Sequence, residues 1–251
     1  MALIKKFRIK SFKKNEQILK LNKISMFYNK RQILNNLNLE INKQEILGML
    51  GPNGVGKSTI FHIITGLKDP SFGKVLINGV DCTNIPIYER ASKFKIGYVP
   101  QHGGFIQDLT LKENLMLVGE IHINDKHLRN EKIEKVISQF EFDPLLKIKA
   151  KYLSGGQKKK LVIAMTLINE PSILLLDEPF AALDILTIKM LQEIIVNLQS
   201  LEKITVVVCD HQARDLLSCV DRAIVLSDGK IIASGSPDEI IKDTNARTAY
   251  F

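Results

Sequence analysis

The stretch Gly51-Pro52-Asn53-Gly54-Val55-Gly56-Lys57-Ser58-Thr59 decides the expected fold of this chain. An apolar run at 45–50 precedes it and predicts a short buried strand, and residues 60–65 predict a helix that ends near Gly66. A strand, a glycine-rich loop and a helix in this order indicate a phosphate-binding P-loop. The glycines let backbone N–H groups surround phosphate oxygens, and the helix dipole favours their negative charge. We therefore expect the chain to bind a nucleoside triphosphate.

Two side chains of this loop have distinct expected roles. Lys57 would reach the β- and γ-phosphates, and the Ser58 hydroxyl would hold Mg²⁺. The alternative is a glycine-rich turn without a ligand, which the full pattern in this context disfavours. The expected ligands are thus ATP and Mg²⁺.

A pair of carboxylates, Asp177 and Glu178, ends the predicted buried strand at 173–176. Open α/β sheets place ligands at such strand ends. Asp177 suits a Walker-B residue that helps to position Mg²⁺ beside Ser58, and Glu178 suits the general base that acts on the attacking water. An acidic pair after a strand is common, but a P-loop in the same chain favours the functional interpretation.

A second glycine-rich stretch, Leu153-Ser154-Gly155-Gly156-Gln157, opens another predicted helix. Ser154 is a natural N-cap, and Gly155 and Gly156 expose backbone N–H groups, so this helix start also suits an anion. Three lysines, Lys158–Lys160, follow in the first turn, where positive charge opposes the helix dipole. They form either a solvated basic face or the place where a phosphate or acidic partner offsets their repulsion.

The net charge of +8 is concentrated at the N-terminus. The first 23 residues hold eight basic residues and one acid, whereas the other 228 hold 27 basic and 26 acidic residues. Because the body of the chain is nearly neutral, no nucleic-acid partner is expected. Apolar residues between the N-terminal bases would suit an anionic membrane surface, and the alternative is a solvated leader. These apolar residues are Leu3, Ile4, Phe7, Ile9 and Phe12.

The leader lacks the apolar segment and cleavage site of a signal peptide. No apolar run approaches the ~20 residues that a membrane span needs. Cys82, Cys209 and Cys219 have no metal-binding spacing, which indicates buried, reduced residues of a cytosolic protein.

Near-continuous apolar strands alternate with helices along the 251 residues, which predicts an α/β fold with a mostly parallel sheet covered on both faces. The first third is expected to be β-rich, and a helical insert is expected between two α/β halves. Strands are predicted at 18–21, 24–28, 33–41, 45–50, 74–79, 95–101, 173–176, 204–208, 222–226 and 230–233. Helices are predicted at 60–65, 110–142, 154–169 and 184–198, with a short one after residue 211.

Together these motifs resemble the ATP-binding-cassette (ABC) ATPases over about residues 18–240. The resemblance implies a P-loop NTPase cassette at 18–251, with an N-terminal antiparallel β subdomain and a helical subdomain at about 102–170. Residues 1–17 would precede it as a basic leader. In that family two cassettes pair head to tail, and each ATP lies between one P-loop and the signature of the other copy, here Ser154–Gln157.

The resemblance also gives roles to single residues. Tyr28 resembles the aromatic residue that stacks on adenine, with Phe27 as a rival, and Ala182–Asp184 resembles the D-loop across the dimer. Gln101 resembles the Q-loop residue that senses Mg²⁺ and water and couples to the membrane partner. His211 resembles the switch histidine that contacts the γ-phosphate. Taken singly, each could be an ordinary packing or turn residue.

Other features resemble the cassettes of the lipopolysaccharide-export system and of branched-chain amino-acid importers. They are residues 177–181, 210–215 and 231–241, and the tail at 243–251 is closer to the export ATPase. The chain departs from these relatives at Ile185, where they carry a proline, and at Lys158–Lys160, which replaces an arginine-rich run. The basic leader is also additional.

The resemblance implies an ATP-hydrolysing translocase subunit, with lipopolysaccharide export as the expected transport and a branched-chain or other importer as the alternative. It would be a homodimer on the cytoplasmic face of the inner membrane. Transmembrane permease subunits would dock near Gln101 and Phe105, with Ile106 and Leu109 as further contacts, unless these residues fill the core of the helical insert. A soluble ABC-type ATPase of ribosomes or DNA and a P-loop kinase are rivals. The first usually carries two cassettes or a long coiled coil, and the second needs an acceptor-binding lid.

Overall fold

The N-terminal part of the chain forms a four-stranded antiparallel sheet. In the computed structural model, which describes residues 16–250, β1 (Gln17–Tyr28) pairs with β2 (Arg31–Asn42), and β4 (Phe72–Ile77) and β5 (Val80–Asp81) follow on the other side of β1. Sequence analysis predicted two strands within β1. The chain instead forms one strand that carries register shifts around Lys23, whose φ of 52° is left-handed.

The central sheet has six strands in the order β10-β9-β3-β8-β7-β6. Five of them, β3 and β6–β9, run parallel to one another, and β10 pairs antiparallel with β9 at the edge. The β9–β10 turn has positive φ at both Asp228 (47°) and Gly229 (71°), as a type I′ hairpin requires. The predicted mostly parallel sheet and N-terminal antiparallel sheet are therefore confirmed. The strands are β3 (Ile46–Leu50), β6 (Ile96–Val99), β7 (Ile173–Asp177), β8 (Thr205–Cys209), β9 (Arg222–Ser227) and β10 (Lys230–Gly235).

The described helices largely follow the predicted ones, but their bounds differ. The P-loop helix begins at Lys57 instead of residue 60, and the predicted helix at 110–142 is two helices separated at 123–125. Three short helices, α3, α9 and α10, were not predicted. The helices are α2 (Lys57–Thr65), α3 (Ile87–Lys93), α4 (Leu111–His122), α5 (Lys126–Gln139), α6 (Gly155–Leu167), α7 (Ile185–Ser200), α8 (Ala213–Leu217), α9 (Pro237–Lys242) and α10 (Thr244–Tyr250), with 3₁₀ turns η1 (Asp143–Leu145) and η2 (Ala150–Tyr152).

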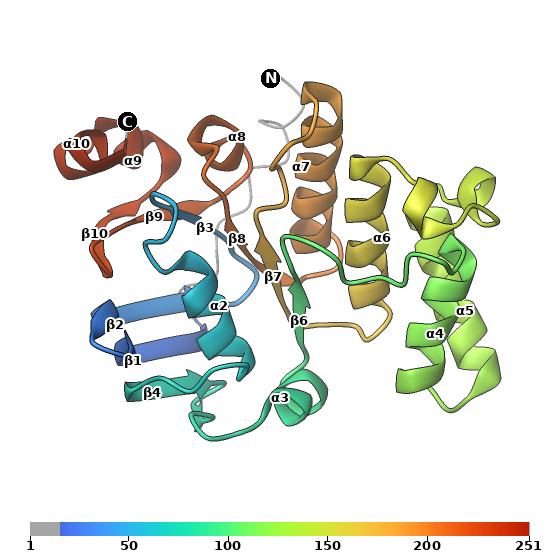
Figure 1. Ribbon diagram of the computed structural model, residues 1–251, viewed down its shortest axis with the longest axis horizontal. Helices are drawn as coiled ribbons and strands as arrows, with labels where there is room; N and C mark the ends of the chain where they lie inside the picture. The colour runs from blue at the N-terminus through green and yellow to red at the C-terminus, as the bar shows by residue number, and fades with distance from the viewer. Residues whose placement is uncertain (1–15, 251) are drawn as a thin grey trace.

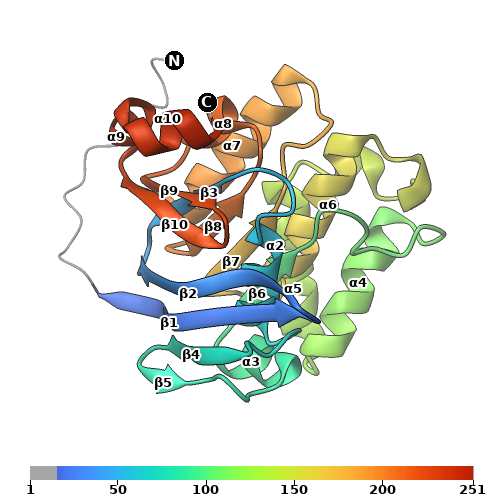
Figure 2. The same cartoon turned by 60° about the vertical axis from the view of Figure 1, so that its left-hand side comes forward.

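The two faces of the central sheet bury different helices. Because side chains alternate along a strand, Leu47 and Met49 of β3 pack with α2 and the antiparallel sheet, whereas Ile46 and Leu50 pack with the cluster that contains α4–α7. Figure 1 shows α4 and α5 at the end of the molecule away from β1, β2 and β4, and Figure 2 shows the antiparallel sheet crossing in front of the central one. The P-loop helix α2 and the signature helix α6 thus lie on opposite faces of the sheet.

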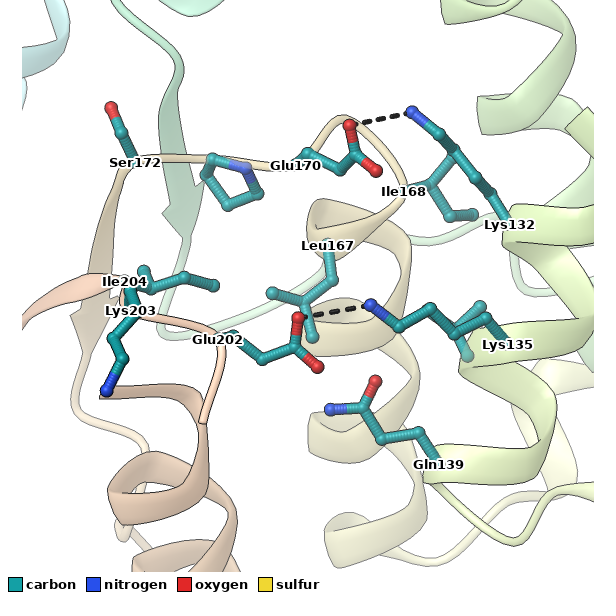
Figure 3. A pocket seen from close by; sticks show the side chains of 12 residues that line it. Lys132, Lys135, Gln139, Leu167, Ile168, Glu170, Ser172, Glu202, Lys203 and Ile204 are labelled. Atoms are coloured by element: carbon teal, nitrogen blue, oxygen red, sulfur yellow. Dashed lines mark hydrogen bonds and ion pairs between the residues drawn. The ribbon is translucent and has the colours of Figure 1, made fainter. Parts of the chain in front are cut away.

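A groove of about 380 Å³ separates α5 from the loops that lead into β7 and β8. Two ion pairs cross it, from Lys132 to Glu170 at 2.8 Å and from Lys135 to Glu202 at 3.1 Å (Figure 3). These loops enter the strands at their amino ends, whereas Asp177 lies at the carboxyl end of β7. The groove is therefore remote from the predicted nucleotide site.

Domain boundaries remain predictions. The basic leader predicted at 1–17 lies mostly outside the described residues, and Gln17 at its end is already the first residue of β1. The insert predicted at about 102–170 contains α4, α5 and α6, and all three contribute to the hydrophobic cluster that covers the central sheet. Between residues 16 and 250, no helix is both long enough and apolar enough to cross a membrane.

Candidate nucleotide-binding site

The P-loop connects β3 to α2 through glycines that the backbone requires. Gly51, Gly54 and Gly56 have φ of 152°, 79° and 112°. A Cβ added at Gly51 would lie 2.7 Å from the Leu226 carbonyl oxygen, and one at Gly56 would lie 2.8 Å from Leu34 Cδ2. No side chain caps the start of α2, so its first N–H groups are left for a ligand.

Lys57 lies across the loop that precedes it. Its side chain is buried, and Nζ donates to the carbonyl oxygens of Gly51 at 2.7 Å and Pro52 at 3.1 Å. The ammonium group is therefore held inside the loop, where the sequence predicts the phosphates. Asn53, Val55 and Thr59 complete the loop and the first turn of α2.

Asp177 is buried at the end of β7 and accepts hydrogen bonds from three elements. The Ser58 hydroxyl donates to Oδ1 at 3.1 Å, the Tyr98 hydroxyl donates to Oδ2 at 3.1 Å, and Cys209 Sγ donates to Oδ1 at 2.8 Å. Burial, followed by the charge of Asp177, raises the pKa of both Tyr98 and Cys209, so both stay protonated as donors. The predicted pair Ser58 and Asp177 is thus brought together.

Sequence analysis missed Tyr98 and Cys209. Strand register carries the signal for both, because β6 and β8 flank β7 in parallel and Cys209 is the direct partner of Asp177. That register was not available from the motifs alone.

Glu178 lies beside two further residues that were predicted to act in catalysis, Gln101 and His211. Gln101 Nε2 donates to its Oε2 at 2.6 Å, and His211 Nδ1 lies 3.5 Å from the same oxygen. Glu178 has a left-handed φ of 46°, an unfavourable conformation for a residue with a side chain, of the kind that clusters at functional sites. Gln101, Glu178 and His211 therefore form one polar cluster beside Asp177.

The side chains around Asp177 fit a magnesium ion. Mg²⁺ prefers hard oxygen ligands and is usually bound by one or two carboxylates together with substrate phosphates. The Ser58 hydroxyl, the Asp177 carboxylate and the Gln101 amide oxygen supply that type of donor. Among residues 16–250, no group of three or more His, Cys, Asp or Glu could hold a metal alone. Mg²⁺ held here would therefore depend on the nucleotide for further ligands.

Lys159 reaches the same cluster from α6. Its Nζ donates to the Gln101 carbonyl oxygen at 2.6 Å. Burial lowers the pKa of Lys159, and the carboxylates of Asp177, Asp210 and Glu178 oppose that shift. Sequence analysis left Lys158–Lys160 open as a solvated face or a site for an acidic partner, and for Lys159 the solvated-face interpretation is wrong.

The signature residues form the start of α6. The backbone N–H of Ser154 donates to Gln157 Oε1 at 2.8 Å, and the Gln157 N–H donates to Ser154 Oγ at 3.2 Å, a reciprocal capping box. Gly156 packs against Thr187 of α7, where an added Cβ would lie 2.4 Å from Thr187 Cγ2. Because α6 and α2 cover opposite faces of the sheet, the described chain does not bring this signature onto its own P-loop.

Tyr28 and Phe27 end β1 with partly exposed rings. The Phe27 ring packs edge-on against Phe72, with centroids 6.3 Å apart, whereas Lys68 Nζ lies 6.0 Å from the Tyr28 ring centroid. Phe27 is thus engaged by another aromatic ring, and adenine stacking by Tyr28 remains a prediction.

The predicted docking segment follows Gln101. Phe105 packs against the hydrophobic core, whereas Ile106 is exposed. Fully buried Asn114 of α4 accepts from the Ile106 N–H at 2.7 Å and donates to the carbonyl oxygens of Ile106 at 3.0 Å and Leu109 at 3.3 Å. Of the two predicted alternatives, packing in the core therefore applies to Phe105. Ile106 lies on an exposed loop that Asn114 holds in place.

Comparisons with known proteins agree with this geometry. Residues 34–181 match the family described as ABC transporter. The chain is 35% identical over 234 residues to the lipopolysaccharide export system ATP-binding protein LptB of Haemophilus influenzae, covering 93% of this chain and 96% of LptB. An ABC transporter ATP-binding protein of Rhizobium meliloti is also 35% identical, over 223 residues that cover 89% of this chain and 82% of the relative.

Solved structures show the same architecture. An ATP-binding cassette of an ABC transporter superimposes with a TM-score of 0.86 at 25% identity and covers 94% of this chain and 100% of the cassette. A dimeric cassette in a post-hydrolysis state with ADP and phosphate has a TM-score of 0.77 at 29% identity and covers 88% and 99% of the two chains. This chain belongs to the ABC transporter family and is an ATP-binding subunit with the ABC ATPase cassette fold.

Proposed function

We propose that this subunit hydrolyses ATP to power the export of lipopolysaccharide from the inner membrane. The observation that carries the ATPase assignment is the cluster of Gln101, Glu178 and His211 beside the buried pair of Ser58 and Asp177. Similarity to LptB over nearly its whole length supports the transported substrate. ATP hydrolysis is the activity that the family implies.

In this proposal Glu178 is the general base. Gln101 donates to its Oε2 and His211 lies beside the same oxygen, so Oε1 would act on the attacking water and His211 would contact the γ-phosphate. Lys57 and the N–H groups of the P-loop would bind the phosphates, and Ser58, Asp177 and Gln101 would hold Mg²⁺. When bound, Mg²⁺ neutralises charge on the phosphate oxygens. Catalysis is then mainly positioning and charge stabilisation.

The proposed working unit is a head-to-tail homodimer. Ser154–Gln157 of one copy would close over the ATP held by Gly51–Thr59 of the other, because the two helix starts are on opposite faces of one chain. A dimeric cassette among the solved relatives supports a dimer as the working unit. Transmembrane subunits would dock near Gln101 and the exposed Ile106 and hold the dimer at the cytoplasmic face of the membrane.

A second candidate is the ATPase subunit of a different ABC transporter, such as an amino-acid importer. The Rhizobium relative, an ABC transporter ATP-binding protein whose name specifies no substrate, is as identical to this chain as LptB is, so another transported substrate is the alternative. The transmembrane proteins that co-purify with the chain distinguish the two candidates.

Glu178→Gln tests the proposed mechanism. The amide keeps the shape of Glu178 but cannot take a proton, so turnover should fall by about 10²-fold or more while ATP still binds. Because bound ATP is no longer hydrolysed, it should hold two chains together, and the dimer should accumulate. The measurement is size-exclusion chromatography with light scattering. Glu193→Gln makes the same change at an exposed position of α7 and should behave as wild type. A Glu178→Gln chain that stays monomeric with ATP and keeps the wild-type rate would refute the mechanism.

A further inference from the structure

Helix α6 joins two functional regions of one chain. The signature Ser154–Gln157 forms its N-cap and first residues, and Lys159 lies about one turn after Gly155, the first residue of the helix. Lys159 Nζ donates to the main-chain oxygen of Gln101 at 2.6 Å. A single rigid helix turn thus links the start of α6 to the loop that carries Gln101.

A second contact ties the same loop to the same helix face. Gly104, three residues after Gln101, has a left-handed φ of 85°, and a Cβ added there would lie 2.8 Å from Val162 Cγ1. Val162 follows Lys159 by three residues, so both side chains lie on one face of α6. A displacement of α6 would therefore also move the Gln101 loop.

The Gln101 side chain extends the link to the candidate general base. Its Nε2 donates to Glu178 Oε2 at 2.6 Å. The path from the signature to Glu178 consists of a helix turn and two short hydrogen bonds, through Lys159 and Gln101.

Lys159 also balances negative charge at this position. Asp177 and Asp210 are buried, and the Glu178 side chain is only 14% exposed. Lys57 lies on the P-loop side and binds its own loop. Lys159 faces the three carboxylates from the α6 side, where a neutral side chain would leave them less compensated.

We propose that Lys159 is a positioning residue that couples the signature of one chain to Gln101 and Glu178 of the same chain. The inference rests on the proposed function, in which the signature contacts the ATP of a second copy. Engagement of one ATP site would then adjust the general base of the other, so the two sites turn over cooperatively.

The test is ATP hydrolysis by the full chain as a function of ATP concentration. Lys159→Met should lower the maximal rate by about tenfold or more, since a misplaced catalytic group can cost up to ~10²-fold. The ATP concentration at half-maximal rate should change by less than about threefold, because the lysine does not touch the nucleotide. The Hill coefficient should fall to about 1 from a higher wild-type value. Lys159→Arg should restore the maximal rate and the Hill coefficient, and Lys189→Met, at an exposed position of α7, is the control.

A double-mutant cycle with Gln101→Ala separates coupling from general damage. If Lys159 acts through Gln101, Lys159→Met should slow a Gln101→Ala chain by less than about twofold. Full additivity of the two losses, or a Lys159→Met chain with wild-type rate and Hill coefficient, would overturn the coupling alone. A wild-type chain without ATP turnover would overturn the proposed function and the coupling together.

Discussion

At the scale of single residues, the placement of Asp177 depends on donors from three different elements. Ser58 of α2, Tyr98 of β6 and Cys209 of β8 each hold one of its oxygens. A buried carboxylate needs such partners, and each hydrogen bond to a charged group contributes about 1.5–3 kcal/mol. Tyr98 and Cys209 therefore fix the carboxylate in place. Ser58 and Asp177 are the pair that is proposed to hold Mg²⁺.

Tyr98→Phe should weaken Mg²⁺ binding at the site proposed beside Asp177. Losing the hydroxyl that donates to Oδ2 frees the carboxylate to rotate, and the Mg²⁺ concentration at half-maximal rate should rise roughly tenfold. The measurement is ATPase rate against free Mg²⁺. Tyr88→Phe removes the same hydroxyl from an exposed residue and is the control. An unchanged Mg²⁺ dependence in Tyr98→Phe would show that Ser58 and Cys209 hold Asp177 in place without the Tyr98 hydroxyl.

Motif residues were predictable from the sequence, but their supporting residues were not. Ser58 and Asp177 are marked by a glycine-rich loop and by a strand that ends in carboxylates. Tyr98 and Lys159 carry no such mark, because their contacts depend on which strands are neighbours and which helix face turns inward. Pairing between distant strands is a property of the whole fold and is absent from local spacing.

At the scale of elements, α2 is fixed at both ends. Its start follows the P-loop, and its end is capped by Arg90, a fully buried residue of α3. Arg90 Nη1 donates to the carbonyl oxygens of Ile63 at 2.7 Å and Ile64 at 3.0 Å. A positive charge at the carboxyl end of a helix is favourable, and here it also satisfies carbonyl groups that the helix leaves free.

Arg90→Met should destabilise the fold by about 3 kcal/mol or more, because several buried carbonyl groups lose their donor at once. The measurement is urea denaturation followed by circular dichroism. Arg90→Lys has one ammonium group in place of the guanidinium fork. Its free energy of unfolding should lie between those of wild type and Arg90→Met. A loss below about 1 kcal/mol in Arg90→Met would show that water replaces the guanidinium.

The starts of helices were predictable where a side chain caps the helix. The helix predicted from residue 110 does begin there, where Thr110 and Glu113 make both bonds of a capping box at the start of α4. The seven-residue helix α3 escaped prediction because it is too short to show a period and has no side-chain cap. Arg90 therefore stood in a segment with no predicted structure.

At the scale of the whole molecule, the central sheet separates the two anion-ready helix starts. The P-loop helix packs on one face, with the antiparallel sheet, and the signature helix packs on the other. Sequence analysis found both motifs, but only the family resemblance placed them on different copies of the chain. The fold explains this separation, because the central sheet lies between α2 and α6 and keeps the signature of a chain away from its own P-loop (Figure 1).

Mixing two inactive variants tests whether each ATP site is built from two chains. Lys57→Met disables the P-loop, and Gly155→Asp places a negative charge where the signature would meet phosphate. The added Cβ at Gly155 has only the flexible Leu183 Cδ2 nearby, at 3.2 Å, so this chain should fold. In a mixed dimer, one site combines both defects and the other combines an intact P-loop with an intact signature.

Each variant alone should therefore be inactive, whereas an equal mixture should recover up to about a quarter of the wild-type rate per chain. Half of the randomly formed dimers are mixed, and each mixed dimer has one intact site of two. The measurement is ATPase rate across mixing ratios at constant total protein, with an optimum at equal amounts. Recovery should be lower than this limit if Lys159 couples the two sites, because the defective site then slows its neighbour. A mixture no more active than its components, while light scattering shows mixed dimers, would mean that Gly51–Thr59 and Ser154–Gln157 do not share a nucleotide across the interface.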